Sequence, residues 1–267
     1  SMVQVYRARE EGRPFESLRS FFGVYKVYDA SEGEYRVLMH GTTVHGAQQL
    51  RDDDGKKAEG RPVPLTYYHK DSPMAATIRA VRARKGGPLK IAVIGLGTGS
   101  LACYAEAGDA WKFFEIDPLM VTVARDSARF TFIKECTPDV PIVVGDARLT
   151  LVREPANQYD LIVVDAYSSD SIPIHLATRE AMALYASKLA PDGVVVMHIS
   201  NRYLELRSVA VGIAAANGLT SWHYDADDFG DDKDEHYIFA SKVVISARRS
   251  QDIGELANDK NWELTPP

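Results

Sequence analysis

The stretch Ile91-Ala-Val-Ile-Gly95-Leu-Gly97-Thr98-Gly99-Ser100 joins a short apolar run to a loop with glycine at every second position. An apolar run that enters such a loop and then a helical pattern predicts a strand, a tight turn and a helix N-terminus. Glycine lets the backbone approach a ligand closely, and a helix end offers free N–H groups. A ligand site is therefore expected here, although turns of a parallel sheet can also collect glycines without binding anything.

The spacing of these glycines separates two kinds of nucleotide loop. The dinucleotide fingerprint G-x-G-x-x-G would require glycine at position 100, where this chain has Ser100. The observed G-x-G-x-G spacing is instead typical of nucleoside-binding loops in methyltransferase-like folds. The loop therefore favours a nucleoside ligand over a dinucleotide.

Strand and helix patterns alternate from about residue 71 onwards. Strands are expected at 89–94, 111–116, 142–144, 161–164, 193–199 and near 236–246, and helices at 72–84, 99–107, from Asp117-Pro118, at 178–189 and at 204–216. This alternation predicts an α/β domain with a parallel sheet covered on both faces. The first 66 residues are β-rich at 21–28, 35–40 and 43–49, which predicts a small antiparallel unit. We expect a β domain at 1–66 and an α/β domain at 67–267.

Composition restricts the class of protein and its partners. A formal charge of −6 over 267 residues argues against a nucleic-acid binder and suits a cationic substrate. The apolar runs are strand-sized, so no membrane span is expected in this chain. Only Cys103 and Cys136 are present, and reduced thiols in the cytoplasm are predicted. The histidines show no metal-ligand spacing, so no metal is expected.

Acidic residues follow three successive predicted strands. They occur at Glu115 and Asp117, in Gly145-Asp146-Ala147, and at Asp165 with Asp170 further along the same loop. In a parallel sheet these strand ends share one edge with the glycine loop. A carboxylate there can accept hydrogen bonds from ribose hydroxyls or an adenine amino group. A helix N-cap is the alternative for any single acid, above all for Asp117, but the series predicts a nucleoside pocket.

Four segments together resemble the spermidine synthase family: IAVIGLGTGS, FFEIDPLMVTVAR, VVGDAR and YDLIVVDAYSSDSIP. The resemblance covers about residues 65–245, and the β-rich unit before it matches the family's small N-terminal domain. It implies a Rossmann-like sheet of the class I S-adenosylmethionine-dependent methyltransferase type. It also implies aminopropyl transfer from decarboxylated S-adenosylmethionine to a polyamine, with methylthioadenosine as the other product. A homodimer or tetramer is expected, because the family's β unit commonly builds one.

The resemblance also implies roles for individual residues. Contacts to the adenosyl sulfonium are expected from Gly95, Gly97, Gly99, Glu115, Asp146 and Ala147, with Glu115 at the ribose hydroxyls and Asp146 at the adenine amino group. Asp165 would be the catalytic carboxylate, and Asp170 the second acid of its loop. Tyr68-His69 stands where the family usually has a Tyr-Gln pair beside the transferred group. Asp165 could take or share the proton of the amine while Tyr68 helps to position it.

The glycine loop departs from the family at Thr98, where an aspartate normally holds the amine of decarboxylated S-adenosylmethionine. Many methyltransferases carry an acid two residues before the first glycine, where this chain has Val93. The loop alone therefore favours neither donor. A small-molecule methyltransferase that uses S-adenosylmethionine is one alternative, and a non-catalytic nucleoside- or polyamine-binding domain is another. The acidic run Asp225–Glu235 is interpreted either as a lid that attracts polyamines or as a solvated loop.

Overall fold

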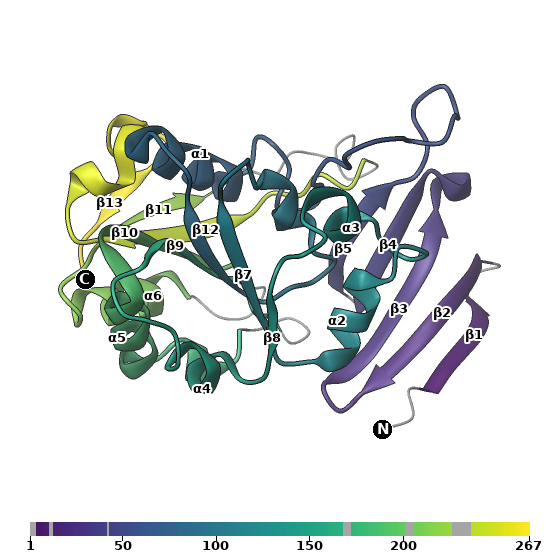
Figure 1. Cartoon of the computed structure of the whole chain (residues 1–267), viewed down its shortest axis with the longest axis horizontal. Helices are drawn as coiled ribbons and strands as arrows, with labels where there is room; N and C mark the ends of the chain where they lie inside the picture. Colours follow the sequence, from purple (N-terminus) through teal and green to yellow (C-terminus); the bar gives the residue numbers. More distant parts are fainter. Residues whose placement is uncertain (1–3, 11–12, 42, 168–171, 201–205, 226–235) are drawn as a thin grey trace.

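The computed structural model describes residues 4–10, 13–41, 43–167, 172–200, 206–225 and 236–267. An antiparallel sheet of five strands comes first, in the order β1-β2-β3-β4-β5 (Figure 1). Its strands are β1 (Gln4–Glu10), β2 (Arg13–Ser20), β3 (Gly23–Ala30), β4 (Tyr35–His40) and β5 (Thr43–Gln49). The predicted N-terminal β unit is therefore confirmed, and β1 and β2 are additional to the strands expected. The boundary between residues 66 and 67 stays a prediction.

A second sheet of eight strands has the order β13-β11-β12-β10-β9-β6-β7-β8. Its strands are β6 (Lys90–Ile94), β7 (Ala110–Glu115), β8 (Ile142–Val144), β9 (Tyr159–Val164), β10 (Leu189–His198), β11 (Thr220–Asp225), β12 (Lys242–Ala247) and β13 (Glu263–Thr265). The strands from β6 to β10 are parallel, whereas β12, β11 and β13 add in antiparallel orientation. The predicted parallel sheet is confirmed from β6 to β10, whereas the edge with β12, β11 and β13 is antiparallel. β11 and β12 are consecutive strands that pair directly, and such pairs are antiparallel unless a crossover connection joins them.

Most of the expected helices are present. The α-helices are α1 (Pro73–Lys85), α2 (Pro118–Arg125), α3 (Phe132–Cys136), α4 (Ala147–Leu151), α5 (Arg179–Lys188) and α6 (Arg207–Ala215). Ser72 caps α1 by accepting a hydrogen bond from the backbone N–H of Ala75, and Gly86 ends that helix at a φ of 67°. Within the described ranges, no helix is long and apolar enough to cross a membrane.

The helix predicted over 99–107 is wrong. Only the short 3₁₀ helix η2 (Ser100–Tyr104) follows the glycine loop. The carboxylate of Asp109 accepts hydrogen bonds from the backbone N–H groups of Glu106 and Leu89, at 3.0 and 2.8 Å. These bonds hold residues 106–109 in a turn that leads directly into β7. The Asp109 side chain therefore accepts the hydrogen bond from the Glu106 N–H that a longer helix would have formed within its own backbone.

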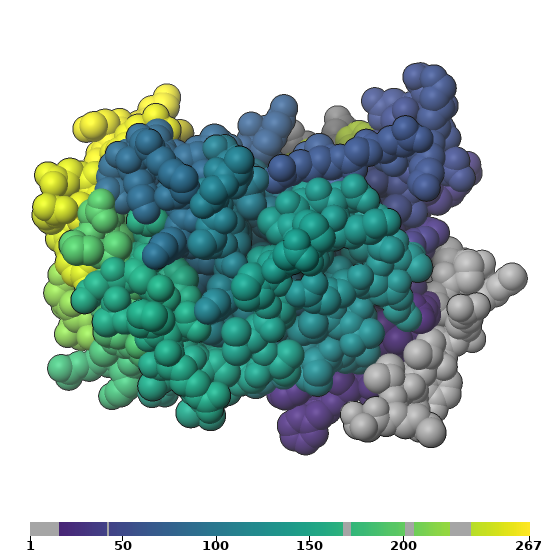
Figure 2. Space-filling model, in the orientation of Figure 1, coloured from purple at the N-terminus to yellow at the C-terminus, as the bar shows by residue number. Residues whose placement is uncertain are grey.

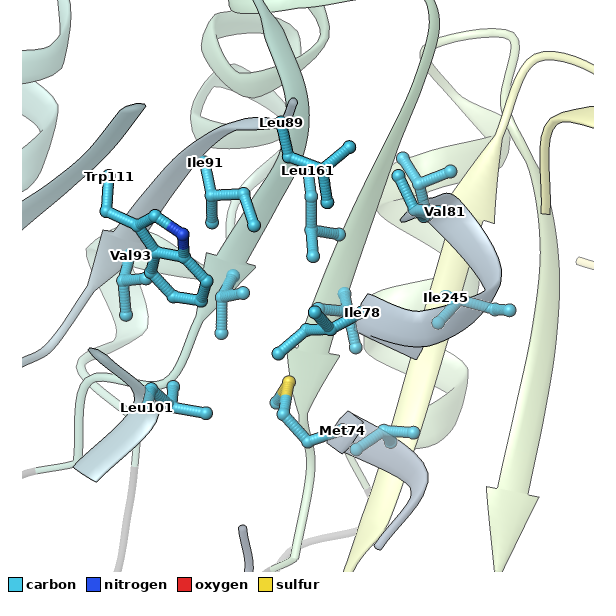
Figure 3. Packing of buried hydrophobic residues seen from close by; sticks show 14 of the residues in the cluster. Met74, Ile78, Val81, Leu89, Ile91, Val93, Leu101, Trp111, Leu161 and Ile245 are labelled. Atoms are coloured by element: carbon cyan, nitrogen blue, oxygen red, sulfur yellow. The ribbon is translucent and has the colours of Figure 1, made fainter. Parts of the chain in front are cut away.

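The eight-stranded sheet has a hydrophobic core on each face. Ile91 and Val93 of β6 pack with α1 and the 3₁₀ helix η4 (Ser250–Asn258), as Figure 3 shows for Ile91, Val93 and the α1 residues. Ala92 and Ile94 lie in the other core, with α4, α5 and α6. Figure 1 shows these two sets of helices on opposite sides of the sheet. The near-continuous apolar strands are therefore buried on both faces, and their carboxyl ends are left to form a site.

The N-terminal sheet shares a core with α2 and α3. The buried residues in this cluster are Leu18, Tyr25, Val27 and Leu38 from the sheet, and Leu119, Met120, Val123, Phe130 and Phe132 from the helical side. Asp117 caps α2 with Oδ1 at 2.9 Å from the N–H of Leu119, and its Oδ2 accepts hydrogen bonds from Ser20 and Tyr25. The two parts form one continuous surface in the space-filling view (Figure 2). Asp117 is thus the N-cap that we expected and also a polar link to the N-terminal sheet.

Cys103 and Cys136 form a disulfide, which contradicts the reduced thiols predicted from the sequence. Their Cα atoms are 4.9 Å apart, although 33 positions separate them in the sequence. The pairing follows from tertiary packing, because Cys103 lies in η2 and Cys136 ends α3, two elements that contact each other. The spacing of two cysteines gives no sign of such packing. The disulfide ties the segment after the glycine loop to α3.

Replacing both cysteines with serine is expected to lower the free energy of unfolding by about 3 to 4 kcal/mol, because the disulfide closes a loop of that length in the unfolded chain. Urea denaturation of the oxidised chain and of the double variant would measure this difference. As a control, a reductant should destabilise the parent chain and leave the double-serine variant unchanged. Coincident unfolding curves for the two oxidised proteins would contradict the prediction.

Candidate active site

The glycine loop lies where the carboxyl ends of β6 and β9 come together. Gly95, Gly97 and Gly99 have φ angles of 101°, 54° and 82°, in the region that favours glycine. A Cβ atom on Gly95 would lie 2.3 Å from the backbone oxygen of Asp165. Gly95 therefore allows a close approach of the two strand ends that any side chain would prevent.

Glu115 is the last residue of β7, and its carboxylate is hydrogen-bonded to the backbone of the glycine loop. Its Oε2 accepts a hydrogen bond from the N–H of Leu96, and its Oε1 accepts one from the N–H of Asp117, both at 2.9 Å. Burial raises the pKa of Glu115, and these two backbone donors oppose the rise. Ile116 is a further backbone donor to this carboxylate, whose two oxygens together can accept about four hydrogen bonds. Glu115 can therefore accept hydroxyl hydrogen bonds from a ribose beside the loop.

Asp146 follows β8, the strand next to β7. Its Oδ1 caps α4 by accepting a hydrogen bond from the N–H of Arg148 at 2.8 Å. Its Oδ2 lies 3.2 Å from Nε2 of His175, and its side chain is 29% exposed. Ala147 is buried in the first turn of α4. The structure thus brings Asp146 and Ala147 to the predicted edge of the sheet, with His175 as a neighbour that we had not expected.

Thr98 contacts the N-terminal sheet. It is 1% exposed, and a Cβ atom on Gly46 of β5 would lie 2.5 Å from its Cγ2. Its hydroxyl has no hydrogen-bond partner within the part of the chain that the structure describes. The loop therefore offers a neutral, buried hydroxyl at the position where the family carries an acid.

Asp165 follows β9 and contacts two side chains from distant parts of the chain. Its Oδ2 accepts a hydrogen bond from the hydroxyl of Tyr68, and its Oδ1 lies 2.8 Å from Nδ1 of His198. The side chain of Asp165 is 5% exposed. Burial and the adjacent Asp165 carboxylate raise the pKa of Tyr68 well above its ordinary value. The phenol of Tyr68 therefore stays protonated and donates to Asp165.

His198 is a site residue that the sequence analysis missed. It ends β10, the strand beside β9, so its side chain reaches the same edge as Asp165. The rings of Tyr67 and Tyr167 lie 5.1 and 5.0 Å from its imidazole, measured between centroids. The histidines had been considered only as metal ligands. The useful signal was the position of His198 at the end of a buried apolar strand.

Two predicted substrate residues have different outcomes. His69 is buried, and its Nδ1 accepts a hydrogen bond from the N–H of Asp71 at 3.3 Å, in the turn before α1. Asp170 lies outside the described residues, as do residues 226–235 of the acidic run. The roles proposed for His69 and Asp170 stay predictions.

Comparison with known proteins gives two curated relatives, whereas no family model matches the chain. Polyamine aminopropyltransferase of Vibrio vulnificus (strain CMCP6) is 32% identical over 116 residues, which cover 41% of this chain and 37% of that protein. A probable polyamine aminopropyl transferase of Bifidobacterium longum (strain NCC 2705) is 23% identical over 185 residues, covering 69% and 36%. The chain thus spans little more than a third of the length of these relatives.

Solved structures extend the similarity to nearly the whole chain. A probable spermidine synthase from Corynebacterium glutamicum ATCC 13032 has a TM-score of 0.63 at 16% identity, covering 86% of this chain and 78% of that one. A spermidine synthase in complex with the transition-state analogue AdoDATO has a TM-score of 0.51 at 16% identity, covering 98% and 80%. The predicted α/β fold with its N-terminal β domain is confirmed. The resemblance to spermidine synthases is confirmed as well.

Proposed function

We propose that this spermidine synthase-like chain transfers an aminopropyl group from decarboxylated S-adenosylmethionine to a polyamine. The observation that carries the proposal is the buried Asp165 carboxylate, held between Tyr68 and His198 beside the glycine loop. A carboxylate at this edge attracts a cationic amine electrostatically to the place where it would attack the carbon bonded to the sulfonium sulfur. The activities for which the curated relatives and the structural neighbours are named support the same chemistry.

In this proposal the donor lies along the carboxyl ends of β6, β7 and β8. The backbone of the glycine loop approaches the nucleoside, Glu115 accepts the ribose hydroxyls, and Asp146 with Ala147 contacts the adenine. The AdoDATO complex of a structural neighbour supports the decarboxylated donor. Thr98 supplies only a hydroxyl near the donor's amine, so we expect that amine to be held without an ion pair from the loop.

The proposed reaction is an in-line displacement at the carbon attached to the sulfonium sulfur. The leaving thioether is neutral and needs no acid, whereas the attacking amine must first lose a proton. Asp165 promotes the loss of that proton while Tyr68 positions the acceptor, with His69 and Asp170 on the acceptor side. Alignment of the two substrates contributes most of the acceleration.

Release of methylthioadenosine is the direct test. Purified protein with decarboxylated S-adenosylmethionine and putrescine, spermidine or agmatine should form methylthioadenosine together with the longer amine. Decarboxylated S-adenosylmethionine and methylthioadenosine should both raise the melting temperature, since a ligand at 100 times its dissociation constant adds about 2.7 kcal/mol of stability. No methylthioadenosine with any of these acceptors would overturn the proposal.

Methyl transfer from S-adenosylmethionine is the second candidate, because the glycine loop with Thr98 and Val93 carries the acid expected for neither donor. A methyltransferase would release S-adenosylhomocysteine in place of methylthioadenosine, so chromatography of one reaction mixture distinguishes the two. A chain that forms neither product and is still stabilised by methylthioadenosine would be a nucleoside-binding domain.

Assembly and location are further parts of the proposal. We propose a homodimer or tetramer built through the N-terminal sheet, in which β1 is an edge strand and Phe21, in the turn between β2 and β3, is 96% exposed. Light scattering would measure the mass. A cytoplasmic location is proposed too, although the Cys103–Cys136 disulfide opposes the reduced thiols on which that prediction partly rested. Thiol alkylation in freshly lysed cells would report their state.

A further inference from the structure

His198 has one ring nitrogen that the described part of the protein does not engage. Its Nε2 is buried and has no hydrogen-bond partner there, and its side chain is 6% exposed. Nδ1 lies 2.8 Å from Asp165. An ionised carboxylate only accepts hydrogen bonds, so the neutral ring carries its proton on Nδ1 and presents a lone pair at Nε2. A buried lone pair without a donor is costly, which points to a ligand that supplies one.

Asp165 is already engaged at both oxygens. Tyr68 donates to Oδ2, and the Nδ1–H of His198 donates to Oδ1. Both oxygens of Asp165 thus have protein donors, whereas Nε2 of His198 has none in the described part of the protein. An aspartate that accepts a hydrogen bond from one imidazole nitrogen fixes the tautomer in which the other nitrogen is free to take a proton. The same aspartate then stabilises the imidazolium that forms.

The surroundings of His198 suit an ammonium ion. The segment before α1 presents Tyr67 and Tyr68, the loop after β9 presents Asp165 and Tyr167, and β12 places the apolar Val243 opposite His198 in the ladder. Asp165 is the one carboxylate in this set. Burial and Asp165 raise the pKa of Tyr167 as well, so its ring stays neutral. Neutral aromatic rings attract cations, whereas a positively charged neighbour would repel them.

We propose that Nε2 of His198 is the proton acceptor for the attacking amine and that Asp165 acts through it. This inference rests on the proposed aminopropyl transfer. The ammonium group donates its N–H to Nε2 and transfers the proton, which leaves a free amine and an imidazolium paired with Asp165. The amine lone pair then forms the N–C bond while the C–S bond breaks. The electron pair of that bond goes to sulfur, giving neutral methylthioadenosine, and the new secondary amine carries the positive charge.

The pH profile of His198→Gln tests this role. Glutamine keeps a hydrogen-bonding side chain but cannot take the proton, so kcat/KM should fall about 100-fold at pH 7.5. Below the amine pKa of about 10, each rise of one pH unit increases the concentration of free amine about tenfold. The ratio of parent to variant kcat/KM should therefore fall about tenfold for each pH unit. The parent enzyme, which uses the protonated amine, should change little over the same range.

His223→Gln is the matched control, because His223 is a buried histidine on β11 whose ring bonds Thr265. It should keep the parent pH profile. Methylthioadenosine should stabilise His198→Gln as it does the parent, which shows that the variant is folded and binds the nucleoside. If the loss of kcat/KM in His198→Gln is the same at every pH, or is absent, the proposed role of His198 is overturned. Turnover by the parent would still uphold the proposed function in that case. A parent enzyme without turnover overturns both.

Discussion

Asp165→Asn is expected to lower methylthioadenosine release by about 1000-fold or more while the chain stays folded. Asparagine has the same shape, but one of its terminal groups donates hydrogen bonds. It therefore cannot accept from Tyr68 and His198 together, as the carboxylate does. The imidazole can turn its proton to Nε2 in response, and the lone pair that would accept the amine proton is then lost. The negative charge that attracts the amine is lost as well.

Initial rates with decarboxylated S-adenosylmethionine and the best acceptor would measure the effect. Methylthioadenosine should still shift the melting temperature of Asp165→Asn, because the proposed nucleoside contacts come from β6, β7 and β8. Asp139→Asn, an exposed aspartate in the loop before β8, removes the same charge away from the site and should keep full turnover. Turnover within tenfold of the parent would show that Asp165 is not catalytic and would favour the non-catalytic binding domain.

Gly95→Ala is expected to cost about 3 kcal/mol or more of stability and to abolish nucleoside binding. Two effects add at this position. The φ of 101° is strained for any residue with a side chain, and the new Cβ would lie 2.3 Å from the backbone oxygen of Asp165 and 2.8 Å from its carbonyl carbon. Backbone cannot rotate away as a flexible side chain can, so the ends of β6 and β9 must separate. Asp165 would then move relative to Tyr68 and His198.

Gly86→Ala provides the matched control for this substitution. Gly86 also has a left-handed φ, of 67°, but a Cβ there would meet nothing within 4 Å. It should therefore cost only the conformational term of about 1 kcal/mol and leave nucleoside binding intact. Urea denaturation and thermal shifts with methylthioadenosine would compare the two variants. Equal losses of stability in Gly95→Ala and Gly86→Ala would show that the close approach of Gly95 to Asp165 adds nothing to the cost of the substitution.

Local sequence patterns predicted the part of the fold that depends on neighbouring residues. The apolar run before Gly95 and the Asp117-Pro118 start of α2 were found because periodicity and capping are short-range properties. The antiparallel edge of the sheet was missed because strand partners are chosen by long-range packing. The same reason applies to Cys103 and Cys136, whose approach depends on how η2 meets α3.

The site was predictable only in part. Tyr68 and Asp165 are 97 positions apart, and only the resemblance to a family suggested that they would lie together. His198 belongs to no local motif, so its place in the site can be recognised only once β10 is known to lie beside β9. Thr98 was noted as a departure from the family, but its burial against Gly46 depends on the docking of the N-terminal sheet. Side chains that act across strands thus need the strand order before they can be recognised.

The link between Asp117 and the N-terminal sheet is expected to make the two parts of the chain unfold together. Phe130 and Phe132 are fully buried in the core that α2 and α3 share with that sheet. Loss of the sheet would expose these rings to water and leave Asp117 without Ser20 and Tyr25. Asp117 stands two residues after Glu115 and donates its backbone N–H to that carboxylate, so disorder in the sheet would be transmitted to the proposed nucleoside pocket. We therefore expect that replacement of the small sheet by an unrelated module would also disturb the proposed donor site.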